Sequence, residues 1–329
     1  MLEFLARRLA QSIVVMLVVA VVAFGLGRYA GDPVDALVGQ DTTQAQRDAL
    51  RHELGLDQPV PVQFVRWLGD AVRGDFGLSW RWRRPVIRLI AERAPATLEL
   101  AFAAALLAFV TGVPLGVYAA LRRERLSARV LMAASLVGVS LPTFLLGLLL
   151  ILLFGVTLRW LPTFGRGDVV DLGGWTTGLL TRSGLRALIL PSVTLALFQA
   201  TVIMRLVRAG MLEVLHGEFI RYARARGLPR HIVLAHALKN ALLPVCSIAA
   251  LQLGSIVAFA IVTEQVFQWP GLGLLFIQAI ERVDLPLVAA YLVLVSAMFV
   301  GVNLCVDLLY GLVDPRLRAD RARPSGTLG

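Results

Sequence analysis

The chain has 329 residues, of which 57% are hydrophobic and only 16% are charged, and its mean hydropathy is +0.75. Soluble domains usually carry about 25% charged residues, so the composition excludes an ordinary soluble globular protein. The formal net charge is +10, and there are only two cysteines, Cys246 and Cys305. Both lie in apolar stretches, which does not support a disulfide framework.

Apolar runs of about 20 residues, each long enough to cross a hydrocarbon core of about 30 Å, recur along the chain. They predict an all-α polytopic membrane protein with six transmembrane helices. The first run follows Arg7 and Arg8, and its length and lack of a small-residue cleavage pattern favour a retained span over a signal peptide. The predicted spans are 9–27, 98–121, 130–154, 187–204, 241–263 and 287–306.

The charge distribution predicts the orientation of these spans. Six spans place both termini on one side, together with the 122–129 and 205–240 loops. That side carries 17 Lys and Arg against 7 Asp and Glu, whereas the other side carries 15 of each. Short loops rich in Lys and Arg stay cytoplasmic, so both termini are expected inside. The basic excess then reflects topology and contact with membrane lipid, and does not indicate nucleic-acid binding.

The predicted organisation has four parts: the cytoplasmic N-terminus and first span (1–27), an external segment (28–97), a membrane core (98–318) and a disordered cytoplasmic tail (319–329). Within the external segment, helical patterns precede Gly55 and occupy 62–72. Pro85 is expected to begin a helix along the membrane surface before the second span. An external landing surface for a partner and simple interfacial packing both remain open for this segment.

The polar stretch from Gly217 to Pro229 predicts two short helices with a break between them. Gly227 suits the left-handed position just past a helix end, and Pro229 suits the first turn of the next helix. One face of the first helix is expected to carry Phe219, Tyr222, Ala223 and Arg226. Such a face fits docking against another protein, or a helix that lies on lipid headgroups.

This stretch, continued to Leu243-Pro244, resembles the cytoplasmic coupling loop of permease subunits in binding-protein-dependent ATP-binding-cassette importers, and most closely the dipeptide/oligopeptide/nickel group. The general loop signature is Glu-Ala-Ala, then Gly, then a distal Leu-Pro. Arg221 and Tyr222 stand where that signature has Glu and Ala, which resembles the variant of the peptide group. The resemblance implies that the residues coupling to an ATPase are Phe219, Arg221, Tyr222, Ala223, Arg226, Gly227, Leu243 and Pro244.

Other stretches extend the resemblance over residues 1 to about 318. The segment 264–273 resembles an external re-entrant or scoop segment of the family, and its Pro and Gly residues break regular helix. A plain external turn is the alternative. The residues implied for this loop are Trp269, Pro270, Gly271 and Gly273. Gly31-Asp32-Pro33, 74–77 and 307–316 also resemble family elements.

The spans hold almost no ionisable groups, which argues against a proton relay. Their polar residues either join helices by hydrogen bonds or line a path for a polar substrate; the candidates for the path are Ser140, Thr143, Gln199 and Gln252. No phosphate-binding P-loop precedes Lys239, the only lysine, so ATP would be hydrolysed by another chain. Zinc-protease and nucleophile-elbow motifs are also missing, so no enzyme, metal or cofactor is expected.

The resemblance implies a non-catalytic permease subunit in the bacterial inner membrane that forms half of a translocation pathway. It implies four kinds of partner: a homologous second permease chain, two ATP-binding subunits, an external solute-binding protein and membrane lipid. A short peptide is the expected substrate, and nickel chelates, glutathione and opines are alternatives. An intramembrane enzyme and a channel are the rival classes.

Overall fold

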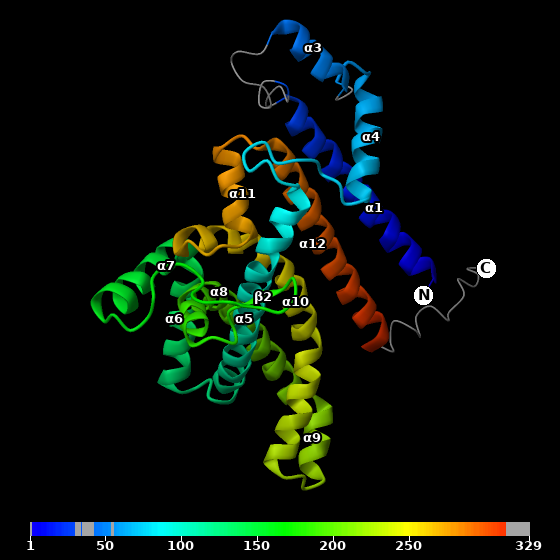
Figure 1. Cartoon of the computed structure of the whole chain (residues 1–329). Helices are drawn as coiled ribbons and strands as arrows, with labels where there is room; N and C mark the ends of the chain where they lie inside the picture. Colours follow the sequence, from blue (N-terminus) through cyan, green and yellow to red (C-terminus); the bar gives the residue numbers. More distant parts are fainter. Residues whose placement is uncertain (1, 30–33, 35–42, 54–55, 314–329) are drawn as a thin grey trace, which may run out of the picture. The chain divides into compact units, whose positions relative to one another are not determined.

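The computed structural model describes residues 2–29, 34, 43–53 and 56–313. Helices dominate this part of the chain, and two short strands form an antiparallel pair (Figure 1). The elements in chain order are α1 Leu2–Tyr29, α3 Gln44–Glu53, α4 Val60–Val72, α5 Val86–Leu121, α6 Leu126–Ser140, α7 Thr143–Leu150, the π-helix η1 Ile151–Thr157, β1 Val170–Asp171, β2 Thr176–Thr177, α8 Arg182–His216, α9 Glu218–Ala225, α10 Arg230–Phe267, α11 Leu272–Glu281 and α12 Leu285–Val313.

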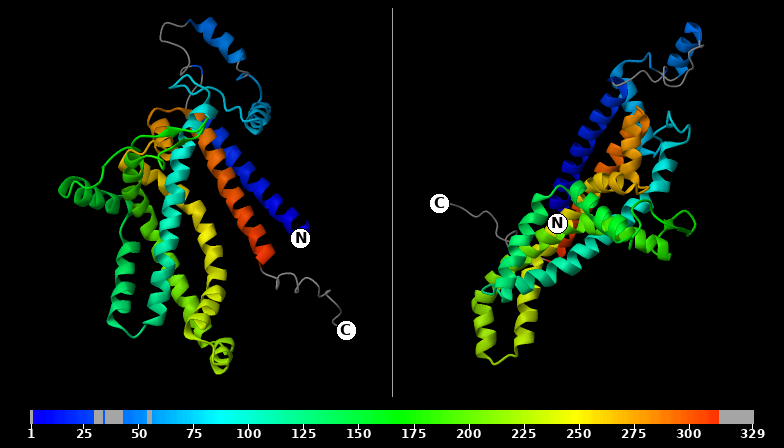
Figure 2. Two further views of the ribbon diagram at one scale, coloured as in Figure 1. Left: turned by 60° about the horizontal axis from the view of Figure 1, so that its bottom comes forward. Right: turned by 90° about the vertical axis from the view of Figure 1, so that its left-hand side faces the viewer.

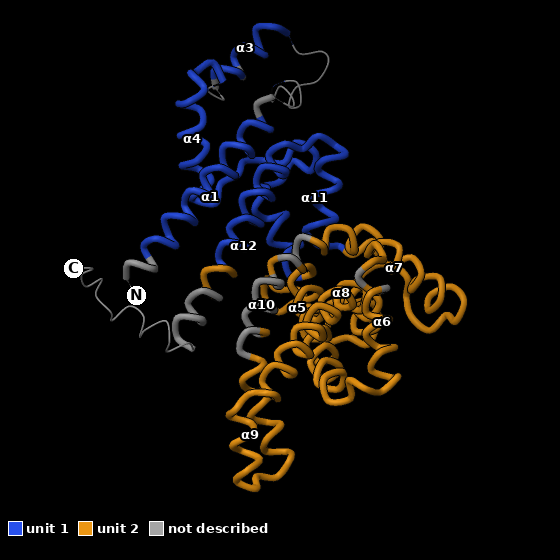
Figure 3. The backbone as a smooth tube through the Cα atoms, turned by 180° about the vertical axis from the view of Figure 1, so that it is seen from behind, with its two compact units in different colours: residues 1–95, 270–301 blue, residues 96–269, 302–329 orange. Residues whose placement is uncertain are grey.

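The chain divides into two compact units (Figure 3). Unit 1 consists of residues 1–95 and 270–301, and unit 2 of residues 96–269 and 302–329. The predicted division at residues 27, 97 and 318 was drawn from the hydrophobic runs alone. That division stays a prediction. Unit 1 itself combines residues before and at the start of α5 with a segment near the end of the sequence, and their apolar side chains are buried together.

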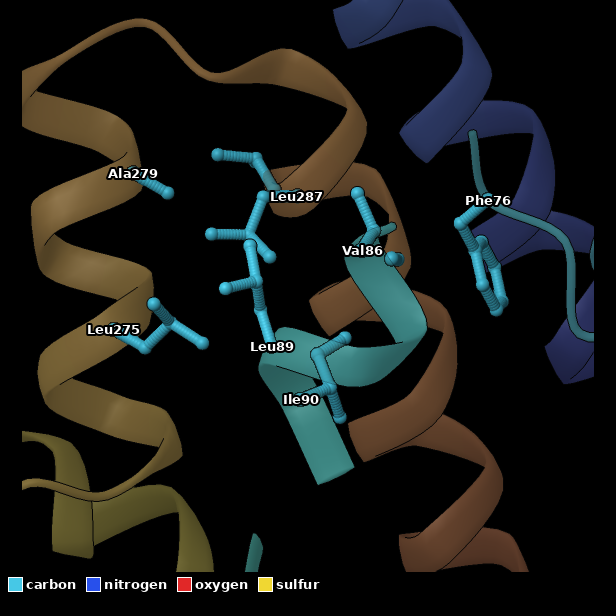
Figure 4. Close-up of a cluster of buried hydrophobic side chains, with 9 residues drawn as sticks. Phe76, Val86, Leu89, Ile90, Leu275, Ala279 and Leu287 are labelled. Carbon is cyan, nitrogen blue, oxygen red and sulfur yellow. The ribbon is translucent and has the colours of Figure 1, made fainter. Parts of the chain in front are cut away.

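The core of unit 1 joins the first turns of α5 to α11 and α12. Val86 and Leu89 are buried against Leu275 and Leu287, and Phe76 belongs to the same cluster (Figure 4). Burial of this kind stabilises a fold by roughly 25 cal/mol per Å² of apolar surface. The first turns of α5 are therefore packed inside protein.

This packing corrects the prediction of a separate surface helix after Pro85. The structure has one continuous helix, α5, that includes both the predicted surface helix and the predicted second span. Pro95 lies inside α5 without ending it. Val86, Leu89 and Ile90 are buried in the core of unit 1, which explains why this stretch continues into one long helix.

Unit 2 is built around α8, which packs against α6, α7 and α10 (Figure 2) and also contacts α5. The contact with α5 depends on Gly112 and Gly116, spaced four residues apart. A Cβ atom on Gly116 would lie 2.7 Å from the Met204 carbonyl oxygen, and one on Gly112 would lie 2.8 Å from the Ala200 oxygen. Small residues at this spacing let two helix backbones approach closely, as they do in membrane helix pairs.

The predicted third span, 130–154, is not one helix. α6 ends at Ser140, and Pro142 takes an extended conformation with φ −57° and ψ 136° before α7 begins. Proline lacks the N–H that a continuous helix needs at this position, which explains the break. The chain then passes from α7 into the π-helix η1.

Within the described residues, four helices are long and apolar enough to cross a membrane: Ala6–Gly27, Val86–Leu121, Arg182–His216 and Leu285–Cys305. A pair of shorter helices, Phe259–Phe267 and Leu272–Glu281, gives a fifth candidate if the two count as one span. The chain is thus a mostly helical, polytopic membrane protein, while the six-span prediction is not confirmed. Gly31-Asp32-Pro33 and the predicted tail 319–329 lie outside the described residues.

Candidate functional site

The predicted coupling segment forms α9 between the ends of the two long helices α8 and α10 (Figure 2). Gly217 separates α8 from α9 with an extended backbone, φ −66° and ψ 152°. α9 contacts both long helices. α9 is therefore packed directly against both α8 and α10.

One face of α9 is buried and the opposite face is open. Ile220 is 0% exposed and Ala223 is 5% exposed, whereas Phe219 and Tyr222 are 55% and 63% exposed. The expectation that Ala223 shares an open face with the aromatic residues is wrong. Its small side chain packs inward beside Ile220, because α9 needs an apolar stripe to seat it on the neighbouring helices.

The break after α9 is a regular helix-ending motif. Gly227 has a φ of +71°, as the sequence predicts, and its N–H donates to the Arg224 carbonyl at 3.0 Å. The N–H of Leu228 donates to the Ala223 carbonyl at 3.3 Å, which completes a Schellman turn. Pro229 precedes the first residue of α10. A left-handed residue at this point favours glycine, which has no Cβ.

The open face of α9 carries aromatic rings and cations. The Arg226 guanidinium lies 5.4 Å from the centre of the Tyr222 ring, and the Phe219 ring lies 6.1 Å from the His236 ring, edge to face. Arg221 is exposed and forms no ion pair with any described residue. Leu243 and Pro244 belong to α10, but their side chains lie outside the described part of the chain.

Two of the four polar residues predicted for a path come together. Thr143 and Gln199 line one pocket of 310 Å³, whose other walls include Phe144, Phe198 and Phe259. Gln199 is 3% exposed and its Oε1 has no hydrogen-bond partner in the described structure. Buried amide groups are normally hydrogen-bonded. Because this oxygen is unpaired, it does not join two helices by a hydrogen bond.

The other two polar candidates do not line that pocket in the described structure. The Ser140 hydroxyl is exposed and donates to the Leu136 carbonyl at 2.9 Å, within its own helix. The side chain of Gln252 lies outside the described residues.

The predicted scoop residues fall on both sides of the boundary between the units. In unit 2, Trp269 is 1% exposed and its indole N–H donates to the Ala96 carbonyl at 3.0 Å. In unit 1, the Pro270 carbonyl accepts from Arg93 at 3.5 Å, Gly271 precedes α11, and Gly273 is buried within it. Trp269 is therefore an anchor of its own unit and not an exposed tip.

Sequence reasoning missed a buried polar cluster in unit 2. The Arg166 guanidinium lies 2.6 Å from the Glu99 carboxylate, and both side chains are about nineteen-twentieths buried, with 6% and 5% exposed. Arg166 also donates to the Thr176 carbonyl at 2.6 Å, and the Thr97 hydroxyl donates to Glu264 at 2.6 Å. We call these two buried pairs, Glu99 with Arg166 and Thr97 with Glu264, the buried cluster. It ties α5 to β2 and α10.

The sequence held a weak signal for this cluster. Glu99 falls at the start of an otherwise apolar run, where an ionised carboxylate needs a partner. Arg166 stands between Gly165 and Gly167, and both take the left-handed conformation that favours glycine, with φ values of +80° and +71°. Nothing in either stretch identifies the other, because the two residues are far apart in the chain.

The comparisons with known proteins agree with this architecture. The family model described as "Binding-protein-dependent transport system inner membrane component" matches residues 112–319, and its N-terminal companion matches residues 1–101. The di/tripeptide transport system permease protein DppB of Pseudomonas aeruginosa is 41% identical to the chain, over 98% of this chain and 100% of that protein.

Two relatives from Escherichia coli K12 are also similar. The dipeptide transport system permease protein DppB is 37% identical over 97% of this chain and 99% of its own. The probable D,D-dipeptide transport system permease protein DdpB is 43% identical over 87% of this chain and 88% of its own. The chain therefore belongs to the family of inner-membrane permease components of binding-protein-dependent transport systems.

Proposed function

We propose that this chain forms half of the translocation pathway of an ATP-driven importer and carries short peptides. The names of the three relatives above, each a permease for peptides, support this substrate class. Nickel chelates, glutathione and opines are the alternative substrates. A homologous second permease chain, two ATP-binding subunits and an external solute-binding protein complete the proposed assembly.

The open face of α9 is the observation that carries the coupling role. Phe219, Tyr222 and Arg226 project from a helix that Ile220 and Ala223 seat on the protein. Exposed aromatic and arginine side chains are the types that dominate protein–protein contacts. In this proposal an ATP-binding subunit binds these three side chains. When that subunit closes, it moves α9, and α9 moves α8 and α10.

The proposed topology has six spans with both termini in the cytoplasm. α6 and α7 then form one broken span, since the 15 residues of α6 extend only about 22 Å at 1.5 Å per residue. The 28–97 segment and the 264–273 turn are placed outside, where the solute-binding protein docks. The excess of Lys and Arg on the opposite side supports this orientation.

The pocket lined by Thr143 and Gln199 is proposed as part of the peptide path. A glutamine amide offers both a donor and an acceptor, which matches the hydrogen-bonding groups of a peptide bond. The aromatic residues around it suit apolar side chains of a passing peptide. Ser140 and Gln252 complete the set of path residues expected from the sequence.

Crosslinking tests the docking of α9. In the assembled transporter, Phe219→Cys and Tyr222→Cys are expected to crosslink to the ATP-binding subunit, whereas Ala223→Cys, a buried position on the same helix, is the matched control and stays unreacted. If Phe219→Cys and Tyr222→Cys react only with lipid-soluble probes, α9 lies on the lipid headgroups and does not dock on the ATP-binding subunit. Uptake of radiolabelled dipeptide into vesicles, competed by nickel chelate, glutathione or opine, tests the substrate separately.

A further inference from the structure

A large basic pocket lies in unit 2, apart from the open face of α9. It has a volume of 1170 Å³ and lies between the turn that joins α5 to α6, the end of α8 and the start of α10. Its charged lining comprises five arginines and one carboxylate: Arg122, Arg123, Arg125, Arg224, Arg230 and Glu124. We call it the arginine pocket.

The positive charge of the arginine pocket is not neutralised within the described structure. Its only carboxylate, Glu124, lies 3.1 Å from the Nε atom of Arg123 and 3.9 Å from a guanidinium nitrogen of Arg129, which is outside the lining. The other four arginines of the lining form no ion pair with any described residue. Like charges gathered in a concave site raise the local potential and attract anions.

Helix ends explain part of this charge but not all of it. The turn after α5 and the end of α8 are helix C-termini, where cations are favourable. Arg230, in contrast, is the first residue of α10, and Pro229 before it provides no side-chain cap. The positive end of a helix dipole therefore adds to the arginine charges at this wall of the pocket.

The lining chemistry selects one class of ligand. Arginine guanidinium groups bind phosphate oxygens in pairs, through parallel N–H donors. Apolar side chains such as Leu212, Leu215 and Val233 also line the pocket. Basic pockets between membrane helices near the cytoplasmic surface bind acidic lipid headgroups. We propose that the arginine pocket binds a phosphate group, carried by an anionic phospholipid whose glycerol and first methylenes contact the apolar wall.

The position of the pocket gives the bound phosphate a structural effect. Arg122 and Arg125 belong to the α5–α6 turn, whereas Arg224 lies on α9 and Arg230 begins α10. In this proposal one phosphate contacts arginines from both places. It thereby ties the α5–α6 turn to the turn between α9 and α10, which contains Gly227. Its placement at headgroup depth rests on the six-span topology proposed above, but phosphate binding itself does not.

Native mass spectrometry of the full-length chain, in nanodiscs with equal phosphatidylglycerol and phosphatidylcholine, tests this proposal. The double variant Arg125→Gln/Arg230→Gln is expected to retain phosphatidylglycerol about 25-fold less, since each basic residue at a membrane surface contributes about fivefold. Arg129→Gln, the matched control from the same turn outside the lining, is expected to retain it as the wild type does. Arg125→Lys/Arg230→Lys keeps the charge and is expected to restore most of the binding.

A second arm separates the two sources of phosphate. In phosphatidylcholine nanodiscs, inorganic phosphate is compared with chloride at equal ionic strength by thermal melting. Stabilisation of the wild type but not of the Arg→Gln double variant supports a phosphate site. If both proteins nevertheless retain phosphatidylglycerol equally, the phosphate comes from a soluble ligand, and the lipid is overturned as its carrier. The proposal is overturned if the double variant and the wild type retain phosphatidylglycerol equally and inorganic phosphate does not raise the melting temperature of the wild type. In a separate pull-down, a double variant that retains lipid as the wild type does but no longer recovers the ATP-binding subunits overturns the proposal too, and assigns the arginines to a protein contact.

Discussion

The buried cluster and the open face of α9 hold arginines in opposite ways, although both belong to unit 2. Arg166 is 6% exposed and pairs with Glu99, and it also donates to Thr176. Arg221 and Arg226 on α9 are exposed, and neither forms an ion pair with a described residue. A buried charge must be paired to be tolerated, whereas an exposed one is hydrated and remains available to a partner. The first arrangement therefore holds a fold together, and the second suits recognition.

The largest expected effect comes from Arg166→Ala. The substitution leaves the Glu99 carboxylate buried without its partner, which costs about 3–5 kcal/mol of folding free energy. Thermal melting of the purified protein in detergent measures this loss. The double variant Glu99→Met/Arg166→Met removes both charges and is expected to recover most of the stability. A single variant as stable as the wild type would contradict a structural role for the pair.

Close packing at Gly116 predicts the next effect. A leucine side chain there meets the Met204 carbonyl and Val207, both within 3 Å of the Cβ position, so α5 and α8 must separate. Overpacking of this kind costs about 1–3 kcal/mol. Gly25→Leu is the matched control, because nothing lies within 4 Å of its Cβ position. The melting temperatures of the two variants decide the outcome.

Gly227→Val tests the hinge beside α9. A β-branched residue in the left-handed conformation costs about 1–2 kcal/mol, and the space around Gly227 is open, so strain is the only penalty. We expect the protein to insert and melt nearly normally while ATP-driven uptake is abolished. Gly227→Asn, which tolerates the left-handed region, is expected to keep most uptake. Normal uptake by the valine variant would refute the hinge.

The smallest effect on stability is expected from Tyr222→Ala, because the ring is exposed. Surface substitutions usually change stability by no more than about 0.5 kcal/mol. Loss of an interface anchor typically costs about 2 kcal/mol of binding, or roughly 30-fold in affinity for the ATP-binding subunit. Pull-down of that subunit by the variant and by Arg129→Gln measures the difference. Equal recovery from both would leave the open face without a coupling role.

Local patterns in the sequence predicted α9 and its ending, but the second short helix is wrong, because it is the start of the 38-residue α10. The spacing of aromatic residues, Gly227 and Pro229 all act within about one helical turn, so the sequence alone specifies them. The inward position of Ala223 was not predictable, because it depends on how α8 and α10 meet α9. Similarly, the break at Pro142 between α6 and α7 was not predicted, because 130–154 reads as one apolar run.

The buried cluster shows the opposite limit of sequence reasoning. Glu99 and Arg166 are 67 positions apart, and Thr97 and Glu264 are 167 apart. No sequence periodicity connects residues so far apart. An ionisable residue at the end of a hydrophobic run also gives no sign of which residue pairs with it. The prediction of a surface helix after Pro85 was wrong for the same reason, distance along the chain. The apolar residues of this stretch are buried by α11 and α12, which come about 190 residues later.

The long sequence separation between the parts of the unit 1 core also has a consequence for biosynthesis. Val86 and Leu89 are made about 190 residues before Leu275, their partner in the core of unit 1. At about 5–20 residues per second, the ribosome needs roughly 10–40 s to supply that partner. During this interval the apolar start of α5 has to be sheltered by lipid, by the insertion machinery or by a chaperone. The core of unit 1 therefore forms only after residues 270–301 have been made, long after the first turns of α5.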